Sequence, residues 1–266
     1  MSRHRRSRLV AAVAAVMLLG CSELPAETGR GERADSAAAS RGAAPATVDH
    51  APWDAILHRT VRDERVDYQA IATDHAAELH QYLAGLAEVD VARLARDEQL
   101  AFYINLYNAT MVQAVLDRWR DGYSVAADGY SVFKQPLVRL KGRTVSLDDL
   151  EKRILLPTYA EPRLHVALVC GAASCPPLIP RAYRASDLDQ VLDGNMRRFI
   201  NDGKRNRIDR QRRRMQLSQL FHWYAEDFGG EAGVPAYVSR YYEGGDVNGF
   251  SIEFLDYSWE LNAIAR

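Results

Sequence analysis

The chain has 266 residues, of which 47% are hydrophobic and 26% are charged, and its formal net charge is −1. This composition excludes a wholly disordered chain and a fibre, because it supplies enough apolar side chains for a folded core. The first twenty residues hold four arginines and no acid, so the rest carries 30 basic and 35 acidic side chains, a net charge of −5. An acidic chain is not expected to bind nucleic acid.

The first twenty residues have the pattern of a secretory signal peptide. Basic residues up to Arg8 precede an apolar run from Leu9 to Leu19. This run is too short to cross a hydrocarbon core of about 30 Å as a helix. The pattern therefore predicts export rather than a membrane span.

The apolar run ends in Leu18-Leu19-Gly20-Cys21, which resembles the lipobox of bacterial lipoproteins. In that family the cysteine carries the lipid and becomes the first residue of the mature chain. The resemblance implies that lipidated Cys21 binds the membrane of a bacterial cell envelope. Ser22 stands where an aspartate would retain the protein in the inner membrane, which favours the periplasmic face of the outer membrane. An ordinary cleaved signal with an unrelated cysteine is the alternative.

Residues 21–48 are expected to form a flexible tether. Small and charged residues dominate the segment, and it has too few large apolar side chains to offset the entropy lost on ordering. Residues 49–266 show no internal repeat and no further change of composition. A stretch of this length forms one sizeable core, so we expect a single domain.

The domain is predicted to be α+β and helix-rich, with a small, mainly antiparallel sheet. Ser146 and Ser186 are positioned as helix N-caps, with Asp149 as the reciprocal partner of Ser146. Glycines at 171 and 229 are expected to end elements. The predicted helices are Trp53–Val61, Ala76–Leu86, Val91–Trp119, Leu147–Leu155, Ser186–Asn201 and Ser218–Phe228; the predicted strands are Arg163–Cys170, a hairpin over Arg207–Leu217, and Phe250–Leu255.

The segment Val91–Trp119 is the strongest helical pattern, and it is apolar on all sides. Such a helix belongs in the middle of a domain. Glu98, Asn105 and Asn108 would then be polar groups in a largely buried setting, where each needs a partner. They form either a structural hydrogen-bond network or the lining of a site.

A second group of reactive residues surrounds a loop rich in small side chains. His165 and Cys170 lie on the predicted strand, and Cys175 follows the loop. Three interpretations remain open: a cysteine nucleophile activated by His165, a Cys170–Cys175 disulfide, and a metal site. The metal site is the weakest, because the spacing matches no zinc pattern. Purely structural cysteines are the alternative to all three, and no metal or cofactor is predicted.

The chain resembles the domain of unknown function 547 family over nearly the whole domain. Five segments in the expected order carry the resemblance: Ala101–Ala109, Ser146–Glu151, His165–Pro176, Leu217–Phe228 and Asp256–Asn262. The resemblance implies that a set of polar side chains converges, namely Glu98, Asn105, Asn108, Glu151, His165, Cys170 and Cys175.

One departure from the family affects the expected site. Bacterial members usually have a histidine after the glutamate that corresponds to Glu151, and here Lys152 stands in its place. Some plant members have serine at the position of Cys175 and keep the residue that corresponds to Cys170. The resemblance therefore favours Cys170 as the more generally needed sulfur.

Two further features have simple structural interpretations. Trp223 and Trp259 are expected to be core residues, with pocket walls as the alternative. A basic cluster lies on the predicted hairpin, where it would discourage strand pairing at a solvated edge; contact with anionic lipid or an envelope polymer is the alternative. The cluster comprises Lys204, Arg205, Arg207, Arg210, Arg212, Arg213 and Arg214.

The sequence leaves two main functional hypotheses for a lipid-anchored envelope protein. The first is a cysteine-dependent hydrolase or acyl transferase acting on amide or peptide-like substrates, with His165 as base and Cys170 or Cys175 as nucleophile. Glu98 or Asn105 would then orient the base. The second is a non-catalytic module that binds a peptide or cell-wall component, and thiol–disulfide chemistry is a third.

Overall fold

The computed structural model describes residues 46–120 and 122–264. The predicted signal peptide, Cys21 and all but the last three residues of the predicted tether lie outside the described residues. Within the described part of the chain, no helix is both long and apolar enough to span a membrane. Helices predominate over three small sheets there, which confirms the α+β expectation.

Helix α4, Arg96–Leu116, is buried around its whole circumference, as its sequence predicts. It is shorter than the predicted Val91–Trp119. A separate 3-10 turn occupies Val91–Arg93, and the extended backbone of Leu94 and Ala95 interrupts the helix before Arg96. At the other end, α4 stops at Leu116 and the following residues form a turn.

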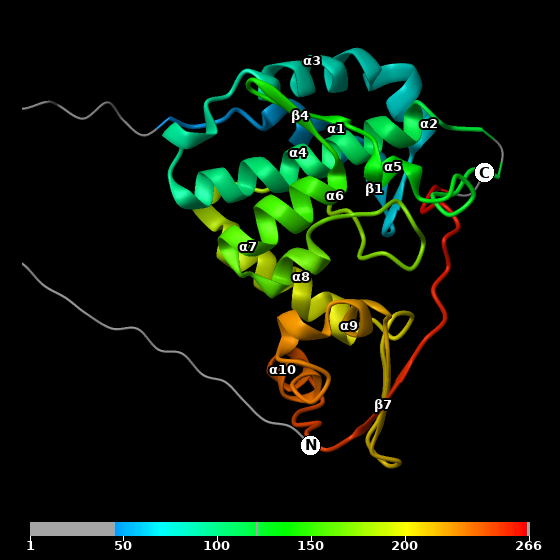
Figure 1. Cartoon of the computed structure of the whole chain (residues 1–266). Helices are drawn as coiled ribbons and strands as arrows, with labels where there is room; N and C mark the ends of the chain where they lie inside the picture. Colours follow the sequence, from blue (N-terminus) through cyan, green and yellow to red (C-terminus); the bar gives the residue numbers. More distant parts are fainter. Residues whose placement is uncertain (1–45, 121, 265–266) are drawn as a thin grey trace, which may run out of the picture. The chain divides into compact units, whose positions relative to one another are not determined.

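Two helices from the N-terminal part of the domain pack beside α4. Helix α1, Ala51–Thr60, contacts α3, Ala76–Ala87, and α3 contacts α4 (Figure 1). The two predicted helices in this region are confirmed to within two residues at each end. The short hairpin of β1, Val61–Arg62, and β2, Arg65–Val66, follows α1. Helix α2, Tyr68–Ala70, and a π-helical turn, Ile71–His75, lead into α3.

The predicted helix Leu147–Leu155 forms in three parts. Helix α6, Leu147–Asp149, is capped by the expected reciprocal bonds between Ser146 and Asp149. A π-helical turn, Leu150–Leu155, follows, and α7, Leu156–Tyr159, completes the element. Helix α5, Ser131–Lys134, and the hairpin of β3, Val138–Leu140, and β4, Arg143–Val145, precede it.

The predicted strand Arg163–Cys170 is wrong. Pro162–Val166 forms a 3-10 turn, and residues 167–170 continue as irregular backbone. The segment from Leu164 to Val169 is buried throughout. Its alternation of residue types therefore did not indicate a half-exposed strand. A short apolar run that is buried on all sides fits several backbone conformations.

A second apolar cluster forms around α8, Leu188–Asn201, and α10, Val234–Tyr241. The predicted helix start at Ser186 is wrong, because Ala185–Asp187 forms a 3-10 turn before α8. The predicted helix Ser218–Phe228 is broken into α9, Leu220–Trp223, and a 3-10 turn, Ala225–Phe228. Gly229 ends it with φ of +92°, as expected of a glycine C-cap.

The largest sheet has three strands in the order β5-β6-β7. Strands β5, Arg207–Asp209, and β6, Arg214–Leu217, form the predicted antiparallel hairpin, and β7, Ser251–Phe254, pairs with β6 in parallel. Most side chains of the basic cluster have hydrogen-bond or ion-pair partners within the protein. Arg212 pairs with Asp209 and Arg214 with Glu253, while Arg210 and Arg213 donate to backbone carbonyls.

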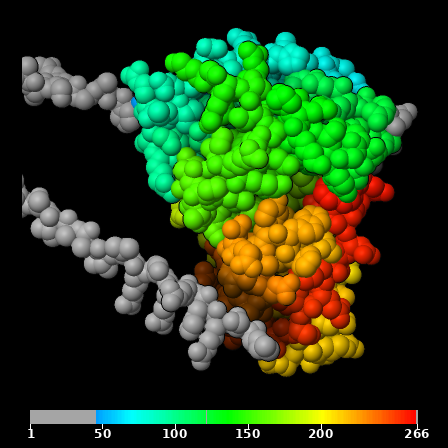
Figure 2. All heavy atoms as spheres, in the orientation of Figure 1, coloured from blue at the N-terminus to red at the C-terminus, as the bar shows by residue number. Residues whose placement is uncertain are grey.

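After β7, residues 256–264 return to the apolar core around α4, against which Trp259 and Leu261 pack, and we call this segment the C-terminal strap. In Figure 2 it lies at the surface, in red, between the orange and green parts of the chain. Its backbone bonds to the loop after Cys170: Ala173 N donates to Glu260 O at 2.7 Å, and Asn262 N donates to Gly171 O at 2.9 Å. The strap therefore brings residues near the C-terminus beside the two cysteines.

Candidate functional site

An open pocket of about 340 Å³ contains both cysteines, and we call it the thiol pocket. Its lining residues come from six separate stretches of the chain, and aromatic rings form much of its wall. The lining residues are Tyr107, Tyr130, Phe133, Lys134, Asp148, Glu151, Lys152, His165, Leu168, Cys170, Cys175, Pro176, Leu220, Trp223, Tyr224, Tyr257 and Trp259.

The backbone around the cysteines is held tightly against α4. Asn108 donates to Ala167 O at 2.9 Å and accepts from Val169 N at 3.0 Å, which fixes the approach to Cys170. Gly171 then turns the chain with φ of +77°, and a Cβ there would lie 3.2 Å from the Met111 methyl group. Only glycine combines this backbone conformation with so close an approach.

The Cys170 sulfur is surrounded by hydrogen-bond donors. The Tyr257 hydroxyl lies 3.3 Å from it, and the Cys175 thiol and the Ala172 amide are its other donors. Burial by itself would raise the pKa of the Cys170 thiol. These three donors stabilise the thiolate more strongly, and the pKa falls below its usual value.

Cys175 has the opposite environment. Its side chain is buried, and burial together with the neighbouring Cys170 raises the pKa of its thiol well above the usual value. Its sulfur accepts a hydrogen bond of 2.8 Å from the Cys170 amide. Both cysteines are free thiols. Cys170 is thus the sulfur disposed to be a thiolate, and Cys175 is a donor to it.

His165 lies on the wall of the same pocket and is paired with Asp227. Its Nε2 is 2.7 Å from Asp227 Oδ2, and its ring stacks on Tyr224 with centroids 3.9 Å apart. Burial lowers the pKa of His165, although the Asp227 contact opposes this shift. The imidazole is therefore neutral near pH 7, and the acceptor carboxylate assigns its proton to Nε2.

Among the described residues, no hydrogen bond joins the His165 ring to either sulfur. Sequence reasoning expected an imidazole to activate the thiol. The low pKa of Cys170 instead arises from the thiol, hydroxyl and amide donors around it. Nδ1 of His165 remains available for a proton.

Glu151 also lines the pocket, and like His165 it contacts Tyr224. Its carboxylate accepts from the Tyr224 hydroxyl at 2.8 Å and from the Tyr107 hydroxyl at 3.2 Å. It sits on the π-helical turn, a local distortion that is frequent at functional sites. Lys152, the departure from the family pattern, pairs with Asp148 at 2.7 Å on the pocket lining.

Aromatic rings form the mouth of the pocket. Trp223 is 46% exposed and stacks on Trp259 with centroids 5.9 Å apart; Tyr257 contacts both rings. Tyr130, 38% exposed, packs edge-on against Trp259. The core interpretation of Trp223 is wrong, since its ring is half exposed on the pocket wall. Trp259 is partly buried and also lines the pocket.

Three predicted site residues lie outside the pocket. Glu98 accepts from Val48 N at 2.8 Å near the start of α4, and Asn105 bonds to the backbone N and O of Tyr183. Within the described chain neither forms a hydrogen bond to His165, whose ring nitrogen bonds to Asp227 instead. Asn108 acts on the backbone before Cys170 and does not line the pocket.

Sequence reasoning missed the partner of His165 and the hydroxyl beside Cys170. Asp227 and Tyr257 both lie within segments that carry the family resemblance, but neither was singled out as a site residue. An acid within a short helical pattern and a tyrosine after a strand give no local signal for this role. Only the folded chain brings them to His165 and Cys170.

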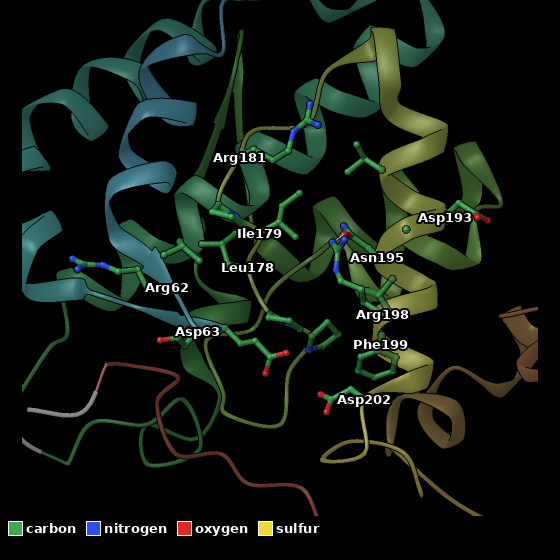
Figure 3. A pocket seen from close by; sticks show the side chains of 18 of the residues that line it. Arg62, Asp63, Leu178, Ile179, Arg181, Asp193, Asn195, Arg198, Phe199 and Asp202 are labelled. Atoms are coloured by element: carbon green, nitrogen blue, oxygen red, sulfur yellow. Dashed lines mark hydrogen bonds between the residues drawn. The ribbon is translucent and has the colours of Figure 1, made fainter. Parts of the chain in front are cut away.

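No group of three histidine, cysteine, aspartate or glutamate side chains in the described chain is arranged to hold a metal ion. Figure 3 shows a larger cavity, of about 980 Å³, lined in part by Leu178, Ile179 and residues of α8. Pro176 lines both cavities. The larger cavity contains neither cysteine, and its lining combines apolar residues with charges of both signs.

Residues 91–200 match the family model described as "Protein of unknown function, DUF547". This match identifies residues 91–200 as a DUF547 family segment. The match includes α4, Glu151, His165 and both cysteines, whereas Asp227, Tyr257 and the two pocket tryptophans lie beyond it. No curated protein and no solved structure gives a significant match. The match therefore identifies a segment of the domain, and the activity has to be argued from the pocket.

Proposed function

We propose that this DUF547 protein is a thiol-dependent acyl-transfer enzyme, a hydrolase or transferase for amide or peptide-like substrates, with Cys170 as nucleophile. One observation carries the proposal: three donors surround the Cys170 sulfur at an open pocket and lower the pKa of its thiol. A thiolate available near neutral pH is the reactive form of cysteine.

His165 and Asp227 supply the proton transfers in this proposal. The Cys170 proton passes to His165 Nδ1, the sulfur attacks the acyl carbon, and the C–N bond breaks as the amine leaves with that proton. His165 Nδ1 then takes a proton from water, whose oxygen attacks the thioester and displaces the Cys170 thiolate. His165 returns this proton to the sulfur, which restores the starting state. In a transferase, an amine or alcohol replaces water. The carboxylate of Asp227 keeps the imidazole in the required tautomer.

The experiment is alkylation of the Cys21→Ala variant of the full chain, in which Cys170 and Cys175 are the remaining thiols. We expect iodoacetamide to modify Cys170 rapidly between about pH 6 and 7, where a free thiol with pKa near 8.5 reacts slowly. Peptide mapping should find the label on Cys170, and Cys170→Ser should abolish it. Cys175→Ala should slow the reaction, because the thiolate loses a donor.

A thiol–disulfide function is the second candidate, because the two thiols are hydrogen-bonded neighbours. If alkylation requires prior treatment with a reductant, the redox function is favoured and the acyl-transfer proposal fails. If alkylation requires denaturant, both thiols are inert. The exposed aromatic mouth would then favour a module that binds a peptide or cell-wall component.

We also propose that lipidated Cys21 anchors the protein at the periplasmic face of the bacterial outer membrane. The signal pattern and the lipobox resemblance support this proposal. Cys21→Ala should release the protein into the soluble periplasmic fraction without altering its melting temperature. Soluble fractionation of both wild type and variant would contradict the anchor.

A further inference from the structure

Arg205 is the buried member of the basic cluster, and its guanidinium contacts the loop that carries Cys175. Its Nε donates to Cys175 O at 3.0 Å, and its Nη2 donates to Ala173 O at 3.3 Å. Its Nη1 pairs with Glu64 at 3.1 Å and with Asp202. The side chain is 9% exposed. The guanidinium thus holds two loop carbonyls on one side and two carboxylates on the other.

The residues held by Arg205 also supply donors to the nucleophile. The Ala172 amide and the Cys175 thiol both donate to the Cys170 sulfur. Arg205 binds the carbonyl of Cys175 itself and the carbonyl of Ala173, the residue after Ala172. The C-terminal strap bonds to the same loop through Ala173 N but makes no hydrogen bond to the Cys175 backbone within the described chain. Arg205 therefore supplies the side-chain restraint on the Cys175 carbonyl.

We infer that Arg205 is a positioning residue for the Cys170 thiolate, an inference that rests on the proposed function. The rigid fork of its guanidinium binds the Ala173 and Cys175 carbonyls together, and this keeps the Ala172 amide and the Cys175 thiol directed at the Cys170 sulfur. Lysine, with a single ammonium group on a flexible stem, cannot reproduce this geometry.

Two carboxylates, those of Glu64 and Asp202, bind Nη1 of Arg205. Glu64 and Asp202 line the larger cavity, where Figure 3 shows Asp202 near the end of α8 and Asp63 on the β1–β2 turn. Both pair with the guanidinium, and within the described chain neither forms a hydrogen bond to residues 170–175. Removing Glu64 therefore tests the ion pair, whereas changing Arg205 tests the hold on the loop.

The test measures the pH at which Cys170 alkylation reaches half its maximal rate, in the Cys21→Ala chain. Arg205→Gln should raise this midpoint and slow the reaction at pH 6.5 by about tenfold, while the maximal rate at high pH changes less than about twofold. Arg205→Lys should give an intermediate midpoint. Arg207→Gln, an exposed change in the same cluster, and Glu64→Gln should leave the midpoint in place.

An unchanged midpoint in folded Arg205→Gln would overturn the inference, and if that variant does not fold, an unchanged midpoint in Arg205→Lys would do so. A shift in Glu64→Gln equal to that in Arg205→Gln would also overturn it, since the ion pair alone would then explain the effect. The proposed function fails separately, if Cys170 of the parent chain does not react below pH 7. The effect of Arg205 on the midpoint remains measurable in that case.

Discussion

Asp227 Oδ2 lies 2.7 Å from His165 Nε2, across 62 residues of sequence. The carboxylate is 42% exposed, whereas the imidazole side chain is 1% exposed. A partly solvated acid thus holds a buried base by one hydrogen bond. This pair connects the segment that matches the family model to the part of the chain beyond it.

Replacing Asp227 by asparagine should lower the pKa of His165 further. Burial already lowers that pKa, and both the hydrogen bond and the charge of Asp227 oppose the shift. An NMR titration of the His165 ring would measure the change. Glu226→Gln, which changes an exposed neighbouring acid, should leave the titration unaffected, and a rise of the His165 pKa in Asp227→Asn would contradict the assigned contact.

The same substitution should slow turnover of an activated ester. In the proposed reaction His165 removes a proton from water during hydrolysis of the thioester, and general-base catalysis of this kind contributes about 10²–10⁴-fold. With p-nitrophenyl acetate, Asp227→Asn should keep the burst of nitrophenol but lose roughly a hundredfold in the steady-state rate. Equal steady-state rates would remove Asp227 from the mechanism.

Trp223→Ala should weaken selection for bulky acyl compounds. The exposed indole forms the mouth of the pocket with Trp259 and Tyr257, and an aromatic contact contributes about 0.5–1.5 kcal/mol. We expect the wild type to prefer N-benzyl chloroacetamide over chloroacetamide by about three- to tenfold as an alkylating agent of Cys170. The preference should disappear in Trp223→Ala and persist in Tyr242→Ala, whose ring belongs to the second apolar cluster.

Asn105→Leu should destabilise the domain by about 2–4 kcal/mol. Its amide satisfies both the backbone N and O of Tyr183, and each unpaired buried group costs about 1–3 kcal/mol. Urea denaturation would measure the loss. Gln113→Leu on the same helix should cost less than about 0.5 kcal/mol, because its bond to Asp117 is exposed. Equal losses in the two variants would contradict a specific role for Asn105.

His50 should make stability fall as the solution becomes acidic. Burial lowers its pKa to about 4, with nearby Arg184 acting in the same direction and Asp49 opposing. The unfolded chain binds a proton at His50 near pH 6.5, whereas the folded chain does so only near pH 4. The free energy of unfolding therefore falls through this window, by roughly 2–3 kcal/mol from this residue.

Urea denaturation at pH 7.5 and 4.5 would measure the contribution of His50. The fall should be smaller in His50→Gln than in wild type by about that amount, since other titrating groups contribute equally to both chains. His58→Gln, a change at an exposed histidine of α1, the helix that His50 precedes, should leave the fall unchanged. Identical falls in His50→Gln and wild type would show that His50 titrates normally.

Local chemistry determined much of the fold. The capping box at Ser146, the all-round apolar pattern of α4, the β5–β6 hairpin and the glycine stop at Gly229 were all predicted, because each depends on residues within one turn or one hairpin. The predictions of secondary structure were wrong in a fully buried segment and at a helix start where a 3-10 turn forms instead. Residues 163–170 and the start of α8 have patterns that several backbone conformations satisfy, and tertiary packing selects among them.

The residues of the thiol pocket were also predicted only in part from the sequence. The sequence by itself determined that His165, Cys170, Cys175 and Glu151 were candidate reactive groups, because histidine, thiol and carboxylate side chains have intrinsic chemistry. The tertiary structure alone decided that Asp227 and Tyr257 join them and that Glu98 and Asn105 do not. It also made the two thiols unequal. The pKa of a thiol depends on its burial and on the donors around it, which the folded chain gathers from distant segments.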